Sequence, residues 1–206
     1  MTTQEKEYFC QLLASLFYPP DQELVKLTHQ GTLYSFFEEY IQILGGTKDL
    51  LKGFLLKEEP EDLWGDLKFE YARLFSGLSE EFVSLVESFY KPWTRDARCS
   101  LSFASEKGLL MGDSAVHLLE IYRQCSLEMS EEFKSCPDHI AMELEFLSYL
   151  YQRATDVEIK MFIKDHLDWI PFLREEVERL HAHSFYVSIL GALDLFIKKE
   201  RERLEV

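Results

Sequence analysis

A short run in the second half of the chain places two carboxylates and an imidazole at helical spacing. Asp138 and His139 follow Pro137 directly, and Glu143 lies four residues after His139. Residues four apart share one face of a helix, so this set could act as a general acid and base. The simpler interpretation is structural, because an aspartate at a helix start accepts hydrogen bonds from free backbone amides. We predict that Asp138 caps the helix, and that the carboxylate and imidazole can still hold a guanidinium or ammonium group there.

Other histidines, cysteines and acidic residues do not reach the spacing of a metal site. Glu178 and His181 form one Glu-x-x-His pair, whereas a di-iron site in a helical bundle needs two. On a helix the rings of His181 and His183 would point about 200° apart, which makes a poor chelate. Cys136 and His139 lack a second pair for zinc, and no phosphate-binding loop or nucleophile elbow occurs. We therefore predict no catalytic residue, no metal site and no cofactor.

Two further stretches bring aromatic side chains close to charged ones. Glu70 and Leu74 share a helix face, with Phe75 next in sequence, and Tyr90 and Trp93 flank a proline. Large apolar side chains belong to the core by default. Trp93 lies in a predicted loop, so it is the better candidate for the wall of a groove.

The elements that must position these residues are predicted to be helices. Apolar residues recur every three to four positions in most segments, and none shows the alternation of a half-buried strand. Asp21 is expected to cap a short second helix. The helices are expected to be ended or separated by four pairs of residues, namely Pro19-Pro20, Gly45-Gly46, Ser76-Gly77 and Pro137-Asp138.

The middle of the chain is less regular than the rest. We predict a loop with short helical turns over residues 78–104, and a helix from about 105 to 124 with an apolar stripe of Leu109, Val116, Leu119 and Tyr122. The whole pattern predicts an all-α fold, a single-domain bundle of roughly nine to eleven helices over residues 1–206. Residues 198–206 are expected to form a frayed helix end.

The composition excludes some partners. The 206 residues carry 22 Lys and Arg against 37 Asp and Glu, a net charge of −15. Such acidity disfavours nucleic acids and anionic membranes and favours a cationic partner. We expect a cytoplasmic protein, because the first residues are polar, no run is long enough to span a membrane, and four scattered cysteines suit reduced thiols.

Several motifs occur in a characteristic order along the chain, namely Glu70-x-x-x-Leu74-Phe75, Glu87-Ser88-x-Tyr90, Pro137-Asp138-His139-Ile140-x-x-Glu143-Leu144-x-Phe146, His166-Leu167-x-Trp169-x-Pro171 and Phe185-Tyr186. Together they resemble the TorD/DmsD/NarJ family of cytoplasmic redox-enzyme maturation chaperones. The likeness spans roughly residues 8–197, and its most specific part is the third motif.

The resemblance implies an all-helical chaperone without enzymatic turnover. Members bind the twin-arginine signal peptide, and often the body, of a molybdopterin oxidoreductase catalytic subunit, and hold the apoenzyme until its cofactor is inserted before export or membrane assembly. Residues 91–104 match no family pattern we can quote, which leaves the client undecided among dimethyl sulfoxide, trimethylamine N-oxide, nitrate and other reductases. By resemblance the signal-binding groove involves Glu70, Leu74, Phe75, Pro137, Asp138 and His139, with Tyr90, Trp93 and Glu143 as looser matches.

The chemistry of such a leader suits this sequence. Two guanidinium groups followed by an apolar helix call for carboxylates beside an apolar groove, and Asp138 and Glu70 are candidate partners for the arginines. Two alternatives stay open: a metal- or nucleotide-dependent helical enzyme, and a helical adaptor that binds a folded partner. The protein could be a monomer or a helix-swapped homodimer.

Overall fold

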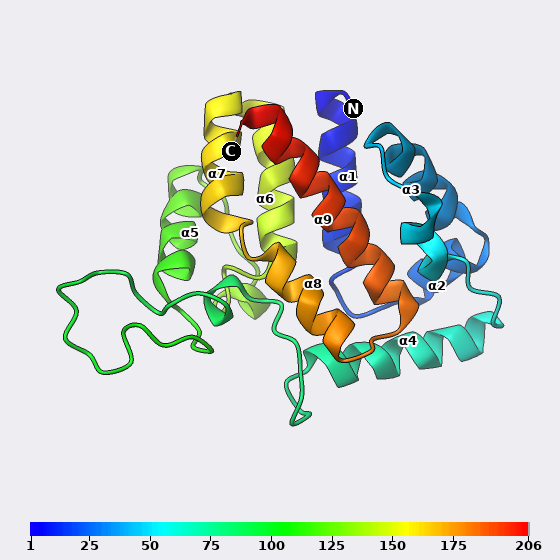
Figure 1. Ribbon diagram of the computed structural model, residues 1–206, viewed down its shortest axis with the longest axis horizontal. Coiled ribbons are helices and arrows are strands. Elements are labelled where there is room, and N and C mark those ends of the chain that lie inside the picture. The colour runs from blue at the N-terminus through cyan, green and yellow to red at the C-terminus, as the bar shows by residue number, and fades with distance from the viewer. Residues whose placement is uncertain (206) are drawn as a thin grey trace.

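The computed structural model describes residues 1–205, whose regular secondary structure consists of α-helices and short 3-10 helices (Figure 1). This confirms the predicted all-α fold. The helices are α1 (Thr3–Ser15), α2 (Gln22–His29), α3 (Thr32–Ile43), η1 (Lys48–Phe54), α4 (Pro60–Phe75), η2 (Glu87–Phe89), α5 (Asp113–Gln124), η3 (Glu131–Phe133), α6 (Ile140–Arg153), α7 (Asp156–His166), α8 (Ile170–Arg179) and α9 (Ser184–Leu204).

The first helix lies at the centre of the bundle. Its most extensive contact is with α6, and Figure 1 shows α9 crossing beside both helices. The ring of Phe9 lies 5.4 Å from Phe37 of α3 and 5.0 Å from Phe196 of α9, centroid to centroid. Aromatic rings at this separation pack closely, so α1 packs against both the early helix α3 and the last helix α9 in one core.

Most predicted helix limits are confirmed. Asp21 caps α2, accepting a hydrogen bond from the Leu24 amide at 2.8 Å. Helix α4 begins at Pro60 and ends just before Ser76, and α6 begins after the Pro137-Asp138 pair. Residues 78–104 form the predicted loop, with η2 as a short helical turn.

The predicted helix over residues 105–124 starts eight residues late. Gly108 has a φ of 83°, in the left-handed region, and the Asp113 amide donates to the Trp93 carbonyl at 2.8 Å. The chain before Asp113 is therefore tied into the loop, and helix α5 begins only there. Val116 and Leu119, expected in the apolar stripe, are exposed, whereas Ala115, Leu118 and Tyr122 are buried.

The predicted frayed end is also wrong for the described residues. Helix α9 continues to Leu204, and Glu200 within it is buried. Its carboxylate pairs with Lys6 Nζ at 2.6 Å and with Arg203 at 2.9 Å, and it accepts a hydrogen bond from Tyr151. Lys6 and Tyr151 come from distant parts of the chain, so their effect on the last helix was not visible locally. Val206 lies outside the described residues.

The His181–His183 stretch is a turn rather than a helix. Helix α8 ends at Arg179, and His181 has a φ of 47°. The His183 side chain caps α9 by accepting from the Phe185 amide at 3.2 Å. The helical geometry used to compare the two rings therefore does not apply here.

Replacing Gly53 with alanine should destabilise the protein by about 1–3 kcal/mol. A Cβ at Gly53 would overlap the Ser184 carbonyl, where η1 packs closely on the start of α9. Gly65 is the matched control, because it lies in α4 with open space around it. Its replacement by alanine should stabilise by about 0.5–1 kcal/mol. Chemical denaturation measures both changes, and an equal effect at the two positions would contradict the close packing.

Candidate functional site

An extended segment, residues 82–86, lies where three of the sequence motifs meet. Its first residues alternate, because Val83 and Leu85 are in the core while Phe82 and Ser84 line a surface groove. The Val83 amide donates to the Leu74 carbonyl at 2.7 Å, which ties the segment to the end of α4. Two-residue alternation of this kind is the geometry of an extended chain with one buried face.

The same segment is tied to the start of α6. The Ile140 amide donates to the Leu85 carbonyl at 2.8 Å, and the Glu87 amide donates to the Asp138 carbonyl at 2.9 Å. Val86 and His139 form an antiparallel bridge. The Leu-Phe motif, the Glu-Ser-x-Tyr motif and the Pro-Asp-His-Ile motif therefore all support one short segment.

The groove beside this segment is aromatic with an acidic edge. The Phe89 ring lies 5.5 Å from Phe82 and 5.8 Å from Tyr90, and Phe172 of α8 is 51% exposed. The Tyr90 hydroxyl donates to the Ser84 carbonyl at 2.9 Å, which fixes the ring. The groove has a volume of about 290 Å³ and is lined by Phe82, Ser84, Phe89, Tyr90, Lys107, Phe172, Glu175 and Glu176.

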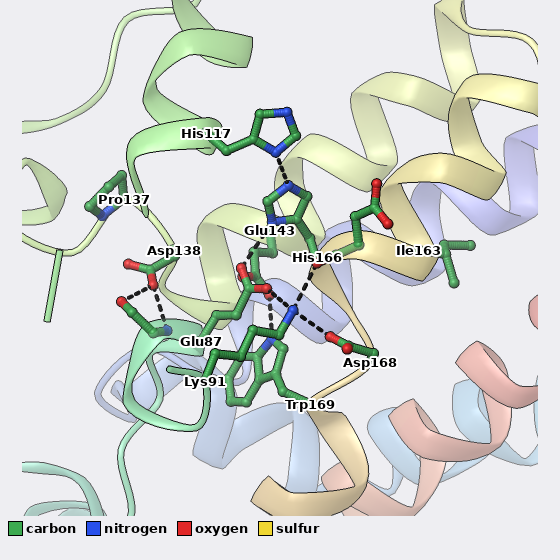
Figure 2. A network of polar contacts seen from close by, with 12 residues as sticks. Glu87, Lys91, His117, Pro137, Asp138, Glu143, Ile163, His166, Asp168 and Trp169 are labelled. Atoms are coloured by element: carbon green, nitrogen blue, oxygen red, sulfur yellow. Dashed lines mark hydrogen bonds and ion pairs between the residues drawn. The ribbon is translucent and has the colours of Figure 1, made fainter. Parts of the chain in front are cut away.

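A buried polar network lies beneath the groove, and Figure 2 shows its side chains converging from η2, α6 and the α7–α8 turn. Glu87 pairs with Lys91, and its other oxygen lies 2.9 Å from His166 Nδ1. Lys91 also contacts Asp168 at 2.5 Å and the Asp165 carbonyl at 2.8 Å. Burial favours the neutral form of Glu87, but His166 and Lys91 outweigh it and lower the pKa of this carboxyl.

Glu143 and Trp169 connect this network to the groove. The Trp169 indole donates to Glu143 Oε2 at 3.1 Å, and its ring stacks on Tyr90 with centroids 5.1 Å apart. Burial, and then the nearby Glu87 charge, raise the pKa of Glu143 well above its usual value. A proton on Glu143 makes it a donor, and the neighbouring Glu87 carboxylate can accept from it.

Glu87, Glu143 and His166 are also the right residue types for a cation. One ligand atom from each lies within 4.8 Å of the others, and all three side chains are buried. The Lys91 ammonium already supplies a positive charge to Glu87, so the set is balanced by the chain's own residues. Sequence reasoning did not find this cluster, because Glu87 and His166 are 79 residues apart.

Asp138 does not cap α6, contrary to the prediction. The cap is His139, whose Nδ1 accepts from the Ala141 amide at 3.2 Å, and burial lowers its pKa to about 4. The Asp138 carboxylate turns the other way and accepts from the Ser88 amide at 2.7 Å and from the Ser88 hydroxyl. Burial raises the pKa of Asp138 against the opposing effect of these hydrogen bonds.

The remaining predicted site residues lie in different surroundings. Glu70 holds Arg73 through two hydrogen bonds of 2.6 and 2.8 Å and also accepts from the His183 amide at 2.7 Å. Leu74 and Pro137 are buried, and Phe75 is partly buried with its ring 5.4 Å from that of Tyr186.

Of the predicted set, only Tyr90 lines the groove described above. Trp93 is partly buried in the loop, with its ring 5.1 Å from Phe103. No helix among residues 1–205 combines the length and the hydropathy needed to cross a membrane.

Comparison with known sequences places the chain in a family. Residues 38–176, more than half of the chain, match the sequence model of the family described as nitrate reductase delta subunit. The protein named Chaperone protein TorD from Shewanella pealeana is 25% identical over 211 aligned residues, covering 98% of this chain and 90% of that protein.

Two Vibrio relatives match over a shorter stretch, and both are named Chaperone protein TorD. The Vibrio atlanticus protein is 28% identical, and the match covers 53% of this chain and 58% of that protein. The Vibrio parahaemolyticus protein is 25% identical, and the match covers 47% of this chain and 50% of that protein. The match thus spans between half and three fifths of these relatives. On the family match, the motifs and the all-helical fold, the chain belongs to the TorD/DmsD/NarJ family of redox-enzyme maturation chaperones.

Proposed function

We propose that the protein is a cytoplasmic chaperone for a molybdopterin oxidoreductase catalytic subunit. It would bind the twin-arginine leader and the apo form of that subunit, and hold them for cofactor insertion before export or membrane assembly. The observation that supports this most directly is the groove beside Tyr90, where aromatic rings lie next to the carboxylates of Glu175 and Glu176.

The groove suits the part of a leader where arginine meets apolar residues. Its volume of about 290 Å³ holds a few side chains rather than a whole helix. Glu176 pairs with Arg179 at 2.9 Å, whereas Glu175 has no ion pair within residues 1–205. Glu175 is thus available to a guanidinium from a partner, and the rings of Phe89 and Phe172 offer apolar contact beside it.

We propose two roles for the residues that the motifs single out. Tyr90 contacts the leader directly, and Glu70, Phe75 and Trp93 are partly exposed and can extend the contact surface. The rest support the groove from within, through the segment 82–86 and Trp169. Those supporting residues are Leu74, Pro137, Asp138, His139 and Glu143.

Leader binding should weaken about tenfold when Glu175 is replaced by glutamine. A hydrogen bond to a charged group contributes about 1.5–3 kcal/mol, and about 1.4 kcal/mol corresponds to one factor of ten. Calorimetric titration with synthetic leaders from neighbouring oxidoreductase genes measures this. Glu39, exposed on α3, provides the matched control, and Glu39→Gln should leave the affinity within twofold.

The peptide itself gives the second control. A leader with both arginines changed to lysine should bind more weakly, because lysine cannot form the planar two-bond contact with a carboxylate. The proposal fails if no leader binds, or if the lysine peptide and Glu175→Gln both leave the affinity unchanged.

A further inference from the structure

Within the groove, a cation of the protein's own chain already lies over one of the aromatic rings. Lys107 lines the groove together with Glu175 and Glu176, and its Nζ lies 5.6 Å from the centre of the Phe172 ring. An ammonium group over an aromatic face is held by the ring quadrupole. We infer that Lys107 marks the position of a leader arginine and competes with it, an inference that rests on the proposed function of this groove.

The backbone around Lys107 is held in place by several hydrogen bonds. The Gly108 amide donates to the Phe89 carbonyl at 2.8 Å, and the Trp93 amide donates to the Glu106 carbonyl at 2.9 Å. Gly108 has a φ of 83°, which a residue with a side chain rarely adopts. The residues on both sides of Lys107 are thus anchored: Gly108 is bonded to Phe89 in the groove wall, and Glu106 is bonded to Trp93 across the loop.

A second contact closes the loop on itself. The Thr94 amide donates to the Ala104 carbonyl at 2.8 Å, and the Trp93 and Phe103 rings meet edge to face. The loop that precedes α5 extends away from the helices (Figure 1). The hydrogen bonds at the base of the loop hold Lys107 at the groove. Residues 91–104, which no family motif covers, thus have a role in positioning Lys107.

The contact that holds the Lys107 side chain is weak enough for another cation to replace it. The side chain is exposed, and no carboxylate within residues 1–205 lies close enough for an ion pair with it. An arginine can stack on Phe172 and at the same time form two parallel hydrogen bonds with a carboxylate, which an ammonium group cannot do. An incoming arginine therefore displaces Lys107. Because Lys107 competes for the same ring, the affinity of the groove for the leader arginine is lower than it would be without this side chain.

The test uses the full chain and a minimal probe, the dipeptide N-acetyl-arginyl-arginine amide, with binding followed by NMR titration of the Phe172 and Tyr90 ring signals. Lys107→Gln should bind the dipeptide about 2- to 5-fold more tightly than the parent protein, the factor that an exposed cation–π contact represents. Lys107→Arg should bind it more weakly, because the arginine is a stronger internal competitor.

Lys68→Gln is the matched control. It removes the same charge and a similar contact, since Lys68 Nζ lies 4.6 Å above the Trp64 ring, but it lies outside the groove. An equal effect of Lys68→Gln and Lys107→Gln would overturn the inference, because the cause would then be net charge. So would ring signals that do not respond to the dipeptide.

A parallel titration with full synthetic leaders separates this inference from the proposed function. If the dipeptide series behaves as expected but no leader binds, the cation site stands and the proposed chaperone function fails. If leaders bind the parent protein, Lys107→Gln and Lys107→Arg with equal affinity, the proposed function stands and the role of Lys107 is wrong.

Discussion

Replacing Lys91 with methionine should lower the free energy of unfolding by about 3–5 kcal/mol, the usual result when one partner of a buried ion pair is removed. The Lys91 side chain is only 10% exposed, and that of its partner Glu87 is fully buried. Without the ammonium group, Glu87 would keep a charge with only His166 to offset it, and Asp168 would lose its contact as well. Urea denaturation followed by circular dichroism measures the loss.

A surface pair provides the comparison for Lys91. Lys199 and Glu202 pair at 2.7 Å on α9 with both side chains partly exposed, so Lys199→Met should cost less than about 1 kcal/mol. The double variant Lys91→Met/Glu87→Gln should recover part of the stability, because the uncompensated charge is removed. Equal losses in Lys91→Met and Lys199→Met would show that Glu87 does not carry its charge in the folded protein.

Glu143→Gln should make the protein more stable relative to the parent as the pH rises. Burial and the Glu87 charge raise the pKa of Glu143, so the folded protein keeps a proton that the unfolded chain releases above its ordinary pKa. The parent therefore loses stability with increasing pH, by up to about 1.4 kcal/mol per pH unit for this one proton. Glutamine does not titrate, and its amide can donate to Glu87 and accept from Trp169 as the protonated acid does.

The measurement is the unfolding free energy of both proteins at pH 5, 6 and 7. The difference in unfolding free energy between Glu143→Gln and the parent should be smallest at pH 5 and grow with pH. Glu128→Gln is the control, because this side chain is exposed and its charge stays in water in both states, so its stability curve should run parallel to that of the parent. A constant difference between Glu143→Gln and the parent would mean that Glu143 is charged in the fold.

The helices could be predicted because their signals are local. Proline at Pro60 and the cap at Asp21 act on the backbone within one turn, so the sequence around them determines where the helix begins. The start of α5 could not be predicted in this way. It depends on the hydrogen bond from the Asp113 amide to the Trp93 carbonyl, and this contact forms only when the loop closes.

The candidate site was predictable in its parts and not in its arrangement. The motifs identified Asp138 and Glu143, but Asp138 turned out to bind Ser88 rather than the helix start, and Glu143 is fully buried. Which way such a carboxylate points depends on a partner fifty residues away. The groove residues Phe172 and Glu175 belong to no motif, and only the packing of α8 beside η2 brings them to Tyr90.

The central position of α1 also determines when the protein can fold. Its partners α6 and α9 are made long after it, and Lys6 can pair with Glu200 only once the last helix has been made. At typical translation rates of about 5–20 residues per second, the apolar face of the first helix waits on the order of 10–40 s on the ribosome for its last neighbour. The complete core around the first helix of this chaperone-family member therefore forms only after Glu200 has been made.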